Sequence, residues 1–206
     1  MSALTLPHFV APPLPARPNF SPRAKSWTVD EFHALWKLPE YETVRMVLIR
    51  GEIFEMPNPN PPHDMATTLA LYLLQSIFGA GFTVRAQMGL VLGLTTDPMP
   101  DIAVIVGSPR DYISHPTMAV LVVEVAKSSL DFDLGLKASL YASAGMADYW
   151  VVDVNGRQVI VHRDPVADSA QPFGAGYARV SANDAGQSIS PLAVPLAAVA
   201  VGDLLP

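Results

Sequence analysis

Residues 118–150, MAVLVVEVAKSSLDFDLGLKASLYASAGMADYW, decide the fold of this chain. The first nine are almost all apolar and rich in valine, which is typical of a central strand covered on both faces. A helix is expected next, because apolar residues recur at helical spacing up to Tyr141 and Gly145 is a C-cap signal. Gly135 lies inside this helix without ending it. The closing DYW begins a further strand, so the stretch predicts a strand, a helix and a strand.

Two carboxylates and a lysine stand out in and near this stretch. Asp101 lies in PMPDIAVIV, and Glu124 lies near the C-terminal end of the apolar strand. The gap between them lets one strand end, a loop turn and a second strand return beside the first, so both carboxylates can meet at one point. Such oxygen ligands hold a hard divalent cation, and a nearby Lys137 can stabilise charge on a phosphate. The arrangement suggests metal-dependent phosphodiester cleavage.

Composition predicts a folded protein whose metal ligands are oxygen or histidine. The chain has 206 residues, of which 50% are hydrophobic, enough for one domain with a sizeable core. Cysteine is absent, so any metal must use Asp, Glu, His or carbonyl oxygen, and a reducing compartment is favoured. Prolines interrupt the N-terminal apolar residues where a signal peptide needs a continuous helix. We therefore expect a cytoplasmic protein with no membrane segment.

The net charge of −6 argues against a broad basic surface for nucleic acid. It does not exclude a nuclease, because the carboxylates of a metal site count as negative until the ion binds, and binding can be confined to a small cleft. We expect weak affinity for DNA in the absence of metal.

The rest of the chain predicts a proline-rich extended arm over residues 1–25 and a single domain over residues 26–206. A short amphipathic helix is expected in 28–38, and a buried helix in 63–78. Hairpins are expected around Arg50-Gly51 and Asn155-Gly156, and edge strands in the tail.

Three segments of the chain resemble the Uma-type restriction endonuclease family of the PD-(D/E)XK nuclease superfamily. They are RMVLIRGEIFEMPNPNPPH (45–63), MPDIAVIV (99–106) and VLVVEVAKSSLDFDLGLKASLYASAGMADYWVVDV (120–154), and the resemblance covers roughly residues 27 to 165. It implies an α/β (α+β) fold with a restriction-endonuclease-like core, in which helices flank a mixed sheet of four or five strands. The two acids then lie on adjacent central strands.

The resemblance assigns metal binding to the two acids. Asp101, which follows Pro100 as the superfamily motif requires, is implied to be the first ligand for Mg²⁺ or Mn²⁺, and Glu124 the second. A backbone carbonyl near Val125 completes the set. The alternatives are that Asp101 is a turn residue after Pro100, and that Glu124 makes a structural ion pair with a lysine.

The position of the lysine departs from the superfamily pattern. The usual lysine lies two residues after the acid, where this chain has Ala126. The resemblance implies Lys137 on the following helix as its replacement. Lys127 is a second candidate, although strand alternation would direct it away from Glu124. Alternatively, Lys137 is a solvated helix lysine paired with Asp133.

Glu52 and His63 occupy places where the family keeps polar residues close to the site. Either can be an accessory residue. Glu52 can equally be an exposed acid of a hairpin, and His63 can cap the following helix. Val47 stands where family members often carry an acid, so a full set of accessory carboxylates is not expected.

The resemblance implies a metal-dependent endonuclease that hydrolyses phosphodiester bonds of nucleic acid, with DNA as the expected substrate and a homodimer as one expected assembly. The alternative is a catalytically degenerate protein of the same fold that acts as a binding or assembly module. The acidic net charge, Ala126 and Val47 support that alternative.

Overall fold

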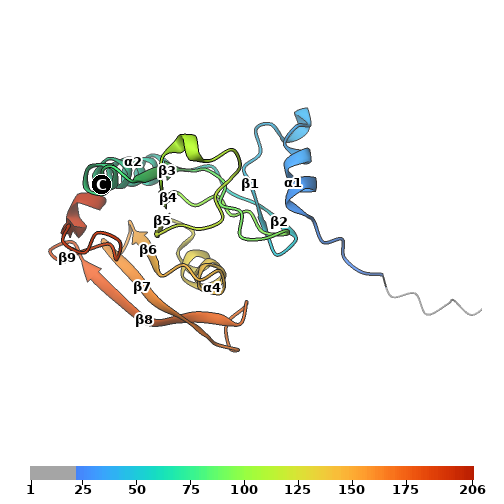
Figure 1. The fold of residues 1–206 in the computed structure, drawn as a ribbon. Helices are drawn as coiled ribbons and strands as arrows, with labels where there is room; N and C mark the ends of the chain where they lie inside the picture. Colours follow the sequence, from blue (N-terminus) through green and yellow to red (C-terminus); the bar gives the residue numbers. More distant parts are fainter. Residues whose placement is uncertain (1–21) are drawn as a thin grey trace, which may run out of the picture.

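The computed structural model describes residues 22–206, and most of the predicted arm lies outside the described residues. At its centre is a six-stranded mixed sheet (Figure 1). Neighbouring strands run antiparallel, except for β5 and β6, which run parallel. In spatial order the strands are β3 (Phe82–Ala86), β4 (Ile102–Val106), β5 (Leu121–Ala126), β6 (Asp148–Asp153), β7 (Gln158–Ala167) and β8 (Ala175–Asp184).

The mixed sheet with flanking helices confirms the predicted fold class, but the sheet is wider than the expected four or five strands. The sixth strand is β8, which forms ten residues of the tail and pairs with almost the whole of β7. The rest of the tail forms a separate two-stranded sheet of β9 (Ser188–Ile189) and β10 (Val199–Ala200).

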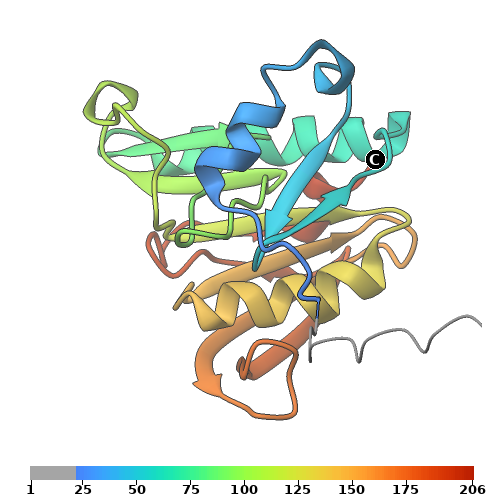
Figure 2. The same ribbon diagram turned by 90° about the vertical axis from the view of Figure 1, so that its right-hand side faces the viewer.

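Helices cover both faces of the sheet (Figures 1 and 2). One apolar core joins α2 to one face and contains Trp150, while the other joins α4 to the opposite face and contains Tyr149. Both aromatic residues are fully buried, as expected of core residues. The helices are α1 (Val29–Leu35), α2 (Pro61–Phe78), α3 (Leu130–Phe132) and α4 (Ala138–Ser143), with 3-10 turns η1 (Pro39–Tyr41), η2 (Pro109–Asp111) and η4 (Val201–Leu204). No helix among residues 22–206 has the length and apolar character to span a membrane.

A smaller unit of α1 and the hairpin β1 (Met46–Ile49) and β2 (Glu52–Glu55) lies beside the sheet (Figure 1). The start of α1 is fixed by a capping box, in which Thr28 and Glu31 satisfy each other's backbone N–H groups. The hairpin turns at Arg50-Gly51 as predicted, with φ angles of 51° and 86°. This unit forms one wall of the cleft described below.

The predicted helix after β5 contains an unpredicted π-helical turn, η3 (Asp133–Lys137), between α3 and α4. The backbone N–H of Ala138 bonds to the carbonyl of Asp133, which is the i→i+5 pattern. Gly135 occupies the middle of this turn. Because η3 adds a residue to the helical turn, it changes the direction in which the side chain of Lys137 points.

Substitution by alanine should change the free energy of unfolding in opposite directions at Gly135 and Gly51. An added Cβ at Gly135 meets nothing within 4 Å, so Gly135→Ala should raise the free energy of unfolding by about 0.5–1 kcal/mol through lower backbone entropy. Gly51 has a φ of +86°, and its Cβ would collide with Ser26, so Gly51→Ala should lower that free energy. Urea denaturation measures both, and a destabilised Gly135→Ala protein would contradict this account of η3.

Candidate functional site

The register of β4 and β5 brings Asp101 opposite Glu124. Ile102 lies opposite Val123, and Asp101 is one residue before Ile102, so the antiparallel register continues to the two acids. The backbone N–H of Asp101 donates to Glu124 Oε2 at 3.4 Å. Side chains alternate along β5, and Glu124 therefore shares a face with Val122, which packs in the α4 core. The two predicted metal ligands meet as expected.

Asp101 is held by one backbone and one side-chain contact. The N–H of Val125 donates to its Oδ2 at 2.8 Å, and His63 Nε2 lies 3.3 Å from the same oxygen. Asn60 caps α2 by accepting from the backbone N–H of His63, so the start of that helix fixes the position of the imidazole. The predicted accessory residue His63 therefore contacts the site.

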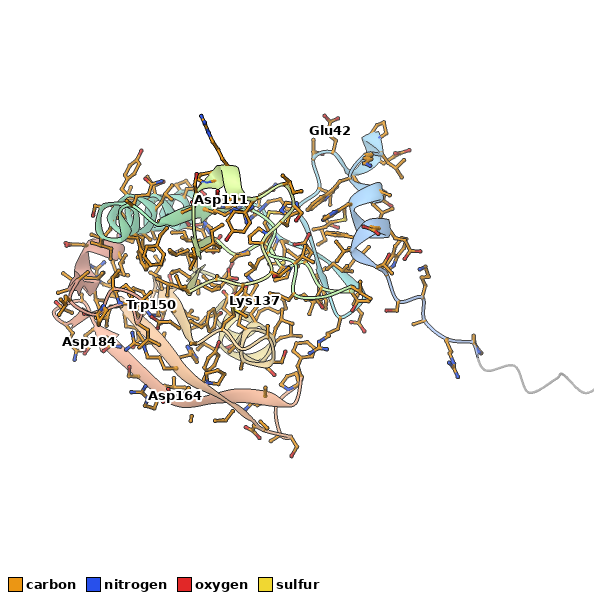
Figure 3. The ribbon with its side chains drawn as sticks, viewed as in Figure 1. Glu42, Asp111, Lys137, Trp150, Asp164 and Asp184 are labelled. Atoms are coloured by element: carbon orange, nitrogen blue, oxygen red, sulfur yellow. The ribbon has the colours of Figure 1, made fainter. Side chains whose placement is uncertain are left out.

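Lys137, which is labelled in the interior of the molecule in Figure 3, is buried between two carboxylates. Its Nζ lies 2.8 Å from Glu124 Oε2 and 3.1 Å from Asp133 Oδ1. Ser129 donates its hydroxyl proton to the other oxygen of Asp133 at 2.6 Å. The expected alternative of an i,i+4 pair with Asp133 is therefore present, but the pair is buried and shared with Glu124 rather than solvated.

Two tyrosines hold this cluster from the α4 side. The hydroxyl of Tyr141 donates to Glu124 Oε1 at 2.8 Å, and that of Tyr149 donates to the carbonyl of Asp133 at 2.9 Å. Burial raises the pKa of both tyrosines well above the ordinary value, so both hydroxyls keep their protons. Both oxygens of Glu124 consequently have a hydrogen-bond or ion-pair partner.

The cluster brings three carboxyl groups together with one lysine and one histidine. Burial raises the pKa of Glu124, and the attraction of Lys137 only partly opposes this rise. Burial alone would lower the pKa of Lys137, but Glu124 and then Asp133 raise it above its ordinary value, so the ammonium stays charged. Burial likewise opposes ionisation of Asp101, yet the His63 hydrogen bond and the charge of Lys137 hold its pKa below the ordinary value. The same hydrogen bond raises the pKa of His63 above its ordinary value.

These groups form the floor of a narrow cleft with a volume of about 70 Å³. The cleft is lined by Asp101, Glu124, Lys137 and His63, and Lys127 lies at its edge. The ammonium of Lys127 donates to Asn155, whereas the ion pair of Glu124 is made by Lys137. Glu52 is exposed on β2 and does not line this cleft, which matches the alternative of a hairpin acid.

The donors at the floor of the cleft suit a hard cation. The N–H and carbonyl of one strand residue point to the same edge, so the Val125 carbonyl shares the edge at which its N–H bonds Asp101. Within residues 22–206, no three His, Cys, Asp or Glu side chains form a group able to hold a metal by themselves. An ion held by Asp101 and Glu124 must therefore take further oxygen ligands from Val125, water or a phosphate, which is the usual binding mode of Mg²⁺.

Comparison with known proteins places the chain in a family. A family model named Uma2, described as "Putative restriction endonuclease", matches residues 29–202. The chain belongs to the Uma2 family. The match confirms the resemblance inferred from the sequence motifs. A search of curated proteins found no match to this Uma2 sequence.

The Uma2 chain shares its fold with a solved protein from Anabaena variabilis, whose crystal structure is described as that of "a putative nuclease belonging to DUF820". The superposition has a TM-score of 0.65, with 18% sequence identity, and covers 86% of this chain and 97% of that chain. At this identity the likeness establishes the fold alone.

Tyr141 is the site residue that the sequence did not reveal. In the sequence it belongs to the apolar face of a helix, and nothing there shows that its hydroxyl meets Glu124. Asp133 was visible as part of an i,i+4 pair with Lys137, but its burial depends on η3 and on Ser129. The sequence feature that could have revealed Tyr141 is its position on the helix that directly follows the strand bearing Glu124.

Removal of the Tyr141 hydroxyl tests whether its hydrogen bond stabilises the buried Glu124. Tyr141→Phe leaves Glu124 Oε1 buried without its donor, which should lower the free energy of unfolding by about 1–3 kcal/mol. The matched control is Tyr177→Phe, which removes a hydroxyl that donates to the carbonyl of Met146. Chemical denaturation compares the two variants, and a smaller loss in Tyr141→Phe than in Tyr177→Phe would contradict this role.

Proposed function

We propose that this Uma2 protein is a metal-dependent endonuclease that hydrolyses phosphodiester bonds in nucleic acid, with DNA as the substrate to test first. The observation that carries the proposal is the meeting of Asp101, Glu124 and Lys137 at the floor of one cleft. Family membership and the shared fold support the same reaction class.

Each residue has a role that follows from its contacts. Asp101, Glu124 and the carbonyl of Val125 would hold Mg²⁺ or Mn²⁺. When bound, the cation neutralises charge on the scissile phosphate and lowers the pKa of a water molecule. Lys137 remains charged and stabilises the negative charge that develops on the phosphate, or orients the attacking water. Tyr141 keeps Glu124 directed at the cleft.

A catalytically degenerate binding module is the second candidate. The observation in its favour is that Lys137 and Tyr141 already occupy both oxygens of Glu124. A carboxylate oxygen can accept more than one contact, so this arrangement does not prevent metal binding. The two candidates differ in whether the cleft supports hydrolysis.

Cleavage assays separate the two candidates. Mixed-sequence DNA should be cut in Mg²⁺ or Mn²⁺, and chelation by EDTA should stop the reaction. Asp101→Asn and Glu124→Gln should each lower the rate at least about 100-fold, because transition-state stabilisation by the cation contributes several kcal/mol. Asp131→Asn is the matched control, since Asp131 is an exposed acid just before η3. Cleavage by both active-site variants at the wild-type rate would contradict the assignment of the site. A lack of cleavage by the wild type would favour the binding module.

Thermal denaturation detects metal binding without catalysis. A cation at 100 times its Kd should raise the free energy of unfolding by about 2.7 kcal/mol, and the melting temperature should rise with it. Asp101→Asn should abolish most of the increase, whereas Asp131→Asn should retain it. If Asp101→Asn retained the full increase, the ion would be bound elsewhere on the chain.

A further inference from the structure

The cleft has two cations at its rim that the proposed chemistry does not use. Arg45 directly precedes β1 on one wall, and Lys127 directly follows β5 on the other. Both side chains are half-buried and line the same cleft as Asp101 and Glu124. The cleft therefore carries two positive charges besides that of Lys137, one next to β1 and one at the end of β5.

Both rim cations have neutral hydrogen-bond partners. Arg45 donates to the backbone carbonyl of Pro57 at 3.1 Å, and Lys127 donates to the side-chain oxygen of Asn155 at 2.9 Å. In the part of the chain that the structure describes, neither forms a salt bridge with a carboxylate. These contacts hold the two side chains in place and leave their charges without an anionic partner.

Burial separates the proposed catalytic groups from the two cations. Asp101, Glu124 and Lys137 line the buried part of the cleft, whereas Arg45 and Lys127 are half-buried and lie nearer to solvent. A polynucleotide with its scissile phosphate at the floor must continue through the more exposed part of the cleft. Its neighbouring phosphates would pass near Arg45 and Lys127 there.

We propose that Arg45 and Lys127 form a rim site that binds backbone phosphates next to the scissile phosphate. This inference rests on the proposed function and identifies the residues that hold the substrate beyond the scissile phosphate. The scissile phosphate has Lys137 at the floor, and the two remaining cations match two further negative charges. A chain of net charge −6 thus attracts nucleic acid at the cleft without a broad basic surface.

Two probes separate rim binding from chemistry. The first is a fluorescein-labelled DNA oligonucleotide, as single strand and as duplex, whose binding is followed by anisotropy over a salt series with Ca²⁺ replacing Mg²⁺. The second is bis(4-nitrophenyl) phosphate, a phosphodiester without neighbouring phosphates, whose hydrolysis is measured in Mn²⁺. The variants are Arg45→Gln and Lys127→Gln. Arg110→Gln is the control, because Arg110 is exposed on η2 and does not line the cleft.

Each rim variant should weaken oligonucleotide binding roughly three- to tenfold and reduce the slope of log affinity against log salt by about 0.7–0.9. Hydrolysis of bis(4-nitrophenyl) phosphate should fall less than oligonucleotide binding, and a melting temperature equal to that of the wild type shows that the variants are folded. Arg110→Gln should match the wild type with both probes. Arg45→Lys should retain most of the binding.

Three outcomes would overturn the rim site: no binding of the oligonucleotide by the wild type, an unchanged salt slope in both rim variants, or a loss of bis(4-nitrophenyl) phosphate hydrolysis equal to the loss of binding. The proposed function fails separately. If the wild type binds DNA through Arg45 and Lys127 but hydrolyses neither probe, the rim site stands and the nuclease proposal does not.

Discussion

The antiparallel register between β4 and β5 is the constraint on which the site depends. It sets Asp101 opposite Glu124, and a shift of one residue would turn Glu124 to the opposite face of β5. Burial of an acid in this position is costly unless it is neutralised and hydrogen-bonded. The ammonium of Lys137 and the hydroxyl of Tyr141 meet that requirement, and both come from the helix that follows β5.

The helix after β5 links the core to the chemistry. Its π-helical turn carries Asp133 and Lys137, while Tyr149 on β6 bonds the carbonyl of Asp133 from the sheet. The same segment therefore packs against the sheet and positions the charged groups. Burial disfavours the ionised form of Glu124, so a cation bound beside it would stabilise the carboxylate. Stability and metal affinity are expected to be coupled at this place.

The sequence predicted the strand that bears Glu124, the hairpins and the meeting of the two acids, because alternation and turn residues are local signals. It did not predict η3, since an i→i+5 turn depends on tertiary contacts such as the bond from Tyr149. Tyr141 was hidden for a similar reason, because its apolar ring accounts for its helical position without its hydroxyl. Glu52 shows the reverse case: a family pattern indicated a site residue, whereas the hairpin geometry leaves it exposed on β2.

The most direct test of the central claim is an anomalous difference map from crystals of the protein grown with Mn²⁺. The account predicts a peak within coordination distance of both Asp101 and Glu124, on the side of the Val125 carbonyl, with Lys137 still near Glu124. A peak located only at other acids, or no peak at Mn²⁺ concentrations that saturate the thermal shift, would contradict it.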